Sequence, residues 1–147
     1  MSFDVQALLD LWTEPPRSDS EAAEAFRRLY TDPVPVNGTA LSAADLVERA
    51  RSLQRTFDDV HREVLEVCDA GTTVAVAFRL EGRQVGPLAT SAGILEPTGR
   101  RLSLRIIDVF SVGDGRITAV TMVADELGAL AAVNAASLVA PTAAARS

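Results

Sequence analysis

Residues 101–130 read RLSLRIIDVFSVGDGRITAVTMVADELGAL and contain the clearest β-sheet signal in the chain. Residues 102–112 and 116–124 both have the composition of β-strands, and Gly113-Asp114-Gly115 stands between them. An Asp-Gly pair between two such runs is a strong signal for a β-hairpin. A short helix is expected to begin near Asp125. The second half of the chain is therefore predicted to form antiparallel sheet.

Two carboxylates of this hairpin are candidate acid/base groups. Asp108 shares a strand face with Leu104, Ile106 and Phe110, where an ionisable group costs free energy unless it is paired, protonated or used. It is either a catalytic or oxyanion-binding group, protonated near neutral pH because burial raises its pKa, or a structural carboxylate held by an arginine or tyrosine. Asp125, at the end of the second strand, is either an acid/base group or the N-cap of the following helix.

The first half of the chain has the periodicity of helices. Apolar residues recur at helical spacing in three segments, 5–12, 21–30 and 43–55. Ser20 or Asp19 is expected to cap the second helix, and Ser42 the third. Further strands are predicted at 60–68, 73–80 and 83–89, with residues 90–98 as a loop.

These elements predict a single α+β domain over residues 1–133. Three N-terminal helices would pack into a conical barrel formed by a strongly curved antiparallel sheet. Residues 134–147 are rich in alanine and are expected to form a flexible tail.

Composition excludes several kinds of chemistry. All 14 basic residues are arginine, so a Schiff base, a pyridoxal phosphate anchor and a phosphate-loop lysine are ruled out. One histidine and one cysteine cannot build a His/Cys zinc site within the chain, so no metal or cofactor is expected. The net charge of -6 argues against a nucleic-acid partner, and no apolar run is long enough to cross a membrane. A cytoplasmic protein with a buried thiol at Cys68 is the expectation.

Several short motifs occur together in the order and spacing of one known family. They are TFDDV at 56–60, PTGRR at 97–101, IDVF at 107–110, GDGRI at 113–117 and DELG at 125–128. Together they resemble the SnoaL-like polyketide (ester) cyclases of the nuclear transport factor 2-like superfamily, with its conical, cystatin-like fold. The resemblance extends over residues 5–133.

The resemblance implies a cofactor-independent enzyme of secondary metabolism. Such an enzyme would act by acid/base catalysis on a small apolar metabolite, and polyketide-type cyclisation is the favoured reaction. The candidate catalytic residues are Asp108, Asp125 and Asn37. The wall of a conical fold is partly its core, so the candidate substrate-binding residues are Trp12, Tyr30, Phe78, Phe110, Met122 and His61.

Other activities of the superfamily remain open. Ketosteroid isomerases match around Asp108, but Asn37-Gly38 and Leu8 stand where that enzyme carries its catalytic base and tyrosine. A limonene-epoxide-hydrolase-like reaction would use Arg79, Glu81, Asp125 and Asn37. Strand alternation argues against it, because it places Arg79 and Glu81 on the face opposite Val76, Phe78 and Leu80.

A third possibility is a non-catalytic module that binds a small ligand or dimerises, because the histidine that cyclases frequently carry near Gln84 is absent. A homodimer is expected in any case. The outer sheet face would carry Arg79, Arg105, Ile107 and Val109, a mixture of apolar residues and arginine that suits an interface. Arg62 is predicted to form an ion pair with Glu66 on the same strand face.

Overall fold

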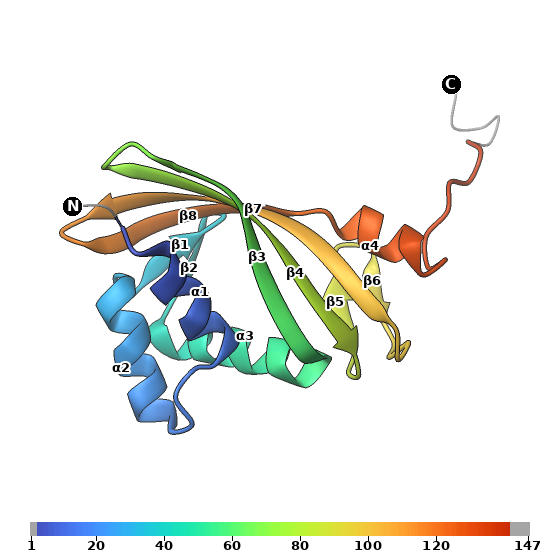
Figure 1. Ribbon diagram of the computed structural model, residues 1–147, viewed down its shortest axis with the longest axis horizontal. Coiled ribbons are helices and arrows are strands. Elements are labelled where there is room, and N and C mark those ends of the chain that lie inside the picture. The colour runs from blue at the N-terminus through green and yellow to red at the C-terminus, as the bar shows by residue number, and fades with distance from the viewer. Residues whose placement is uncertain (1–2, 142–147) are drawn as a thin grey trace.

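The computed structural model describes residues 3–141, which form three helices, a curved sheet and a fourth short helix (Figure 1). The helices are α1 (Val5–Thr13), α2 (Asp19–Leu29), α3 (Ala43–Thr56) and α4 (Glu126–Ala132). The strands are β1 (Val34–Val36), β2 (Thr39–Leu41), β3 (Phe57–Asp69), β4 (Thr73–Gln84), β5 (Leu88–Thr90), β6 (Gly93–Leu95), β7 (Arg101–Gly113) and β8 (Arg116–Ala124).

The main sheet has six strands in the order β2-β1-β8-β7-β4-β3. Helices α1, α2 and α3 all lie on one side of it, which we call the inner face; the opposite side is the outer face (Figure 1). The predicted α+β fold with a curved sheet over three helices is therefore confirmed. The edges of the sheet are β2 and β3, and its strands pair antiparallel except for β1, which pairs with β8 in parallel.

The hairpin of β7 and β8 forms as the sequence predicts. Asp114 and Gly115 both have positive φ, 53° and 77°, as a tight two-residue connection requires. Along β7 the inner-face side chains Leu104, Ile106 and Phe110 are buried. Asp108 lies among them on this face.

The region after β4 differs from the prediction. Residues 83–89 do not form a separate strand; β4 continues to Gln84, and the predicted loop 90–98 contains β6, which pairs with β5. The fully buried side chain of Gln84 donates to the carbonyl oxygens of Gly86 and Leu95 and accepts from Thr98 Oγ1. Because both the nitrogen and the oxygen of this buried amide are hydrogen-bonded, the Gln84 side chain holds the chain in a turn.

The helix caps agree with the prediction in part. Ser42 caps α3 as expected, but the cap of α2 is Ser18, whose side chain accepts from the Glu21 amide. The two predicted caps, Asp19 and Ser20, both lie within the helix, because it begins at Asp19.

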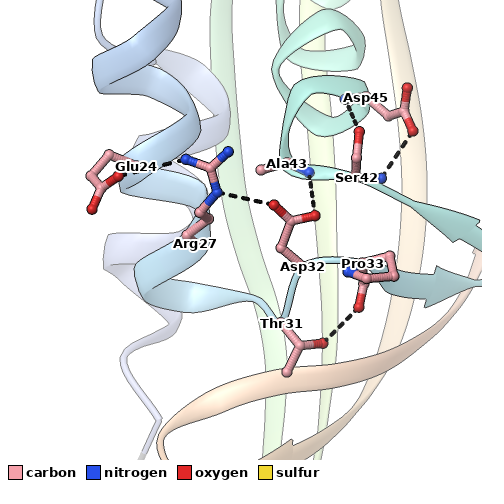
Figure 2. Close-up of polar contacts among 8 residues, drawn as sticks. All are labelled: Glu24, Arg27, Thr31, Asp32, Pro33, Ser42, Ala43 and Asp45. Atoms are coloured by element: carbon pink, nitrogen blue, oxygen red, sulfur yellow. Dashed lines mark hydrogen bonds and ion pairs between the residues drawn. The ribbon is translucent and has the colours of Figure 1, made fainter.

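The junction between α2 and α3 is held by side-chain contacts to the backbone (Figure 2). Asp32 accepts from Arg27 Nε at 3.0 Å and from the Ala43 amide at 3.1 Å. The hydrogen bond from Arg27 holds the pKa of Asp32 below its ordinary value. Ser42 Oγ accepts from the Asp45 amide, and the Asp45 carboxylate accepts from the Ser42 amide, which makes a capping box. Helix α3 is thereby fixed at the end that faces α2.

Replacing Ser42 by alanine is expected to lower the free energy of unfolding by about 1 kcal/mol, because alanine cannot accept from the Asp45 amide. Ser42→Asp retains an acceptor at the cap and should lose little. Urea denaturation of the two variants and the parent checks this. Equal stability of all three proteins would show that the cap contributes nothing.

The end of the chain has little regular structure. Residues 135–141 contain neither helix nor strand, and the remainder of the predicted tail, residues 142–147, lies outside the described part. Within residues 3–141, no helix combines the length and apolar character needed to cross a membrane.

Candidate functional site

An apolar cavity of about 410 Å³ lies between the helices and the inner face of the sheet. That volume is in the range of sites for small organic ligands. The wall combines side chains from helices and strands, among them Leu8, Trp12, Leu46, Phe78, Leu104 and Met122. Of the predicted substrate-binding residues, Trp12, Tyr30, Phe78, Phe110 and Met122 all line this cavity.

Asp108 is part of the cavity wall and has no partner there. Its Oδ1 atom is buried and accepts no hydrogen bond from the described residues. Burial raises the pKa of Asp108 to about 6, although the positive charge of Arg62 lowers it in part. With a pKa of about 6 the carboxyl group titrates just below neutral pH, and the direction of the shift agrees with the one expected from burial on an apolar strand face.

Arg62 is the site residue that the sequence analysis missed. It lines the cavity and donates a hydrogen bond to Thr13 Oγ1 at the end of α1. The predicted ion pair with Glu66 is not among the ion pairs of residues 3–141. Burial lowers the pKa of Arg62 to about 10, so the side chain remains a cation at neutral pH.

A bulge in β3 explains why Arg62 faces inward. Asp58 pairs with Arg83 of β4. Three residues later along β3, His61 pairs with Glu81, which is only two residues from Arg83. The extra residue shifts the alternation of side chains by one, so His61 turns outward and Arg62 inward. Val60 and Val64 share this alternation with Arg62, but the sequence does not reveal the bulge that turns their face inward relative to Phe57.

His61 accordingly lies outside the cavity, contrary to the prediction. Its side chain is exposed, and its Nε2 is 3.3 Å from Asp59 Oδ1. It lines a second groove, between α1 and β3, which shares Leu9 and Arg62 with the cavity.

Trp12 and Tyr30 form a polar pair within the apolar wall. Trp12 Nε1 donates to the Tyr30 hydroxyl at 2.8 Å, and Phe26 packs edge-on against the Trp12 ring. Burial raises the pKa of Tyr30, so its phenol is neutral at all ordinary pH values. Because the hydroxyl oxygen already accepts from Trp12, its own proton is left to donate to a ligand.

Asn37 and Asp125 also lie outside the cavity. Asn37 donates to the Met122 carbonyl and accepts from the Met122 amide at 2.8 Å, so it joins the end of β1 to β8. Asp125 is exposed and accepts from the Gly128 amide at 2.9 Å, as the N-cap of α4. Its neighbour Glu126 lines the cavity instead and is hydrogen-bonded by Ser91.

Arg79 and Glu81 are on the outer face, as strand alternation predicts. Arg79 Nη1 is 3.3 Å from Glu63, and Arg79 Nε is 3.9 Å from Glu81. Neither residue lines the cavity, and neither do Asn37 and Asp125. The four residues of the epoxide-hydrolase alternative are therefore not assembled around it.

Three further expectations from the sequence concern metal ligands, Cys68 and the outer face of the sheet. Among residues 3–141, no three His, Cys, Asp or Glu side chains gather as metal ligands would. Cys68 is exposed on the edge strand β3 and is not the buried thiol that the sequence suggested. Ile107 is 54% exposed on the outer face, and Arg105 and Val109 are exposed beside it.

Solved structures share this fold at low sequence identity. TsrD from Streptomyces laurentii superposes with a TM-score of 0.73 at 20% identity, covering 89% of this chain and 92% of that one. A SnoaL-like polyketide cyclase from Agrobacterium tumefaciens superposes with a TM-score of 0.69 at 16% identity, covering 87% and 92% of the two chains. At such identities these similarities show the fold alone.

The match to a protein family is more specific than the similarity of folds. No curated protein matches the chain. Residues 5–133, nearly the whole chain, match the family of SnoaL-like polyketide cyclases. The motifs from the β3 bulge to the start of α4 lie within this match, and so do Asp108 and the cavity around it. The chain belongs to the SnoaL-like polyketide cyclase family.

Proposed function

We propose that the apolar cavity is the active site of a cofactor-independent enzyme that cyclises a polyketide-type carbonyl compound, with Asp108 as the general base. The observation that carries this proposal is Asp108 Oδ1, a buried carboxylate oxygen in a mostly apolar cavity, which accepts no hydrogen bond from residues 3–141. A pKa of about 6 leaves the carboxylate ionised at neutral pH and still basic enough to take a proton. Membership in the cyclase family supports the reaction class.

The reaction would consist of a proton transfer to Asp108, the formation of a C–C bond, and a proton transfer back from Asp108. Asp108 removes a proton from the carbon next to a substrate carbonyl, and the C–H electron pair becomes the C=C bond of an enolate. The enolate carbon then attacks a second carbonyl of the same molecule, which closes the ring with a new C–C bond. The resulting alkoxide takes the proton back from Asp108, which regenerates the base. Holding both carbonyls in one cavity makes this step intramolecular.

Tyr30 would assist as a neutral donor. Its phenol is fixed by Trp12, and its proton is available to a carbonyl oxygen in the cavity. A donor that is preorganised in an apolar site stabilises developing negative charge without reorganising.

Exchange of α-hydrogens tests the proton-abstraction step without knowledge of the natural substrate. A suitable probe is 2-tetralone, a bicyclic ketone with acidic benzylic α-hydrogens, dissolved with the protein in deuterium oxide and followed by proton NMR. The protein is expected to accelerate the loss of the α-proton signal above the buffer rate. A rate equal to that of buffer, with binding of the ketone shown by line broadening, would contradict the proposal and indicate a ligand-binding protein.

The exchange rate is expected to rise with pH and to level off above the pKa of Asp108, about 6. Below that pH the carboxyl group is protonated and cannot accept a proton, so the rate should fall about tenfold for each pH unit. Rates measured across this range, corrected for buffer exchange, give the midpoint. A corrected rate that does not change across the range would exclude Asp108 as the base.

We also propose that the outer face of the sheet forms a homodimer interface. Ile107 and Val123 are 54% and 67% exposed there, and these two residues are partners across β7 and β8. Ile107→Glu is expected to convert the dimer into a monomer, because two carboxylates would be buried across the symmetry axis. Multi-angle light scattering measures this, with Leu127→Glu on α4 as a control. A parent protein that is monomeric at micromolar concentration would contradict the interface.

A further inference from the structure

Arg62 shares the mostly apolar wall of the cavity with Asp108 and adds a positive charge to it. Its charge lowers the pKa of Asp108, and the charge of Asp108 in turn raises the pKa of Arg62. Both side chains line the same cavity, yet no hydrogen bond or ion pair joins them among the described residues. The two side chains therefore line the same cavity and are not paired with each other.

Thr13 holds the guanidinium of Arg62 in place. Thr13 Oγ1 accepts from Arg62 Nη1 and donates to the Leu9 carbonyl at 2.8 Å, so the last turn of α1 anchors the side chain. A guanidinium has five N–H donors, and the hydrogen bond to Thr13 engages one nitrogen. Donors thus remain for a group bound in the cavity.

We propose that Arg62 binds the oxyanion that forms on the substrate when Asp108 removes its proton. This inference rests on the proposed function of Asp108 and adds a second group that touches the reacting atoms. The C–H bond breaks, its proton passes to Asp108 Oδ1, and its electron pair forms the enolate, whose negative charge resides on the carbonyl oxygen. That oxygen lies between Asp108 and Arg62.

The net charge of the cavity supports this arrangement. Before the step, the negative charge is on Asp108; after it, Asp108 is neutral and the charge is on the substrate oxygen. Arg62 compensates one negative charge in both states, so the transfer requires no net charge to enter or leave the apolar cavity. In a site of low dielectric, a fixed cation of this kind acts without reorganisation.

The position of Arg62 also narrows the class of substrate. The other charged side chains of the wall are Arg49 of α3 and Glu126 of α4, and Glu126 is already hydrogen-bonded by Ser91. A ligand that satisfies Arg62 and Asp108 together has a carbonyl oxygen next to an acidic C–H group, on an otherwise apolar ring system. Aryl ketones and 1,3-dicarbonyl compounds have this chemistry.

Binding of a stable oxyanion tests the assignment without turnover. The probe is 2,4-dinitro-1-naphthol, which is ionised at neutral pH and carries its charge on a delocalised oxygen, as an enolate does. Its methyl ether is the neutral reference. Affinities of both are measured by fluorescence quenching for the parent, Arg62→Gln, Arg62→Lys and Arg28→Gln. Arg28 is an exposed arginine of α2 that does not line the cavity, so its loss controls for net charge.

The parent is expected to bind the naphtholate about tenfold or more tightly than the ether, as a hydrogen bond to a charged group implies. Arg28→Gln should retain this preference, Arg62→Lys should retain part of it, and Arg62→Gln should lose it while still binding the ether. Binding of the ether by Arg62→Gln shows that the variant has kept the cavity. Equal affinities in the parent, a preference that survives Arg62→Gln, or no binding of either compound would overturn the assignment.

The pH dependence separates this inference from the proposed role of Asp108. Affinity for the naphtholate should rise as the pH falls through about 6, because protonation of Asp108 removes a negative charge from the cavity. Asp108→Asn should abolish that dependence and leave the preference for the naphtholate intact. If Asp108→Asn leaves exchange of 2-tetralone unchanged but Arg62→Gln still removes the preference, Asp108 is not the base and Arg62 remains an oxyanion site.

Discussion

Asp108→Asn is expected to slow the protein-catalysed exchange of 2-tetralone by about 10²–10⁴-fold. Asparagine has nearly the shape of aspartate, but its amide cannot take a proton from carbon at neutral pH. The fold should remain intact, because the buried Oδ1 atom has no partner to lose among the described residues. Thermal melts of the variant and the parent, recorded with the exchange rates, separate a loss of chemistry from a loss of structure.

Asp125→Asn provides a matched control for that experiment. Asp125 caps α4 on the surface, and asparagine is an equally good cap, so both stability and exchange should stay near the parent values. If Asp125→Asn lost exchange while Asp108→Asn retained it, the catalytic base would be Asp125. A large loss of stability in Asp108→Asn would instead make Asp108 a structural residue.

Phe26→Ala is expected to lower the free energy of unfolding by about 3–5 kcal/mol, the range for removing a buried aromatic ring. Phe26 is fully buried on α2, and its ring centroid is 5.2 Å from that of Trp12 and 6.0 Å from that of Tyr30. The vacated space lies directly behind the Trp12–Tyr30 pair. The substitution should therefore also weaken binding of apolar ligands in the cavity.

Phe26→Leu serves as the reference, because it keeps most of the apolar volume and should lose much less stability. Urea denaturation gives both values if the slope of the transition is unchanged. A loss below about 1 kcal/mol in Phe26→Ala would mean that the helices repack around the missing ring.

The part of the site on β7 could be predicted from the sequence because its strand alternates regularly. Leu104, Ile106 and Phe110 define one face, and any residue in step with them must share it. The structure places Asp108 on that face and in the cavity wall. Alternation on β4 likewise placed Arg79 and Glu81 outside.

The part on β3 could not be predicted, because a bulge shifts the alternation between Asp58 and His61. Asp59 adopts a φ of 52° there, which aspartate tolerates better than most residues, but a single Asp is a weak signal. One inserted residue decides whether His61 or Arg62 enters the cavity. The inward position of Arg62 also brings a cation to the wall that Asp108 shares, and its charge lowers the raised pKa of that carboxyl group in part.

Asn37 illustrates a second limit of sequence reasoning. Its side chain is hydrogen-bonded to the backbone of Met122, which is 85 residues away in the chain. The parallel pairing of β1 with β8 brings the two residues together. Local sequence around Asn37 predicts only a turn. A role can therefore be assigned to a polar residue near a strand end only when the order of the strands in the sheet is known.

Burial and the charge of Arg62 act in opposite directions on the pKa of Asp108, the proposed base. The most direct measurement is a carbon-13 NMR titration of the Asp108 carboxyl carbon, assigned by comparison with Asp108→Asn. We expect a midpoint at about 6, and a higher midpoint in Arg62→Gln, because removing the cation disfavours the charged carboxylate. A midpoint near 4, the ordinary value for aspartate, that does not change in Arg62→Gln would contradict it.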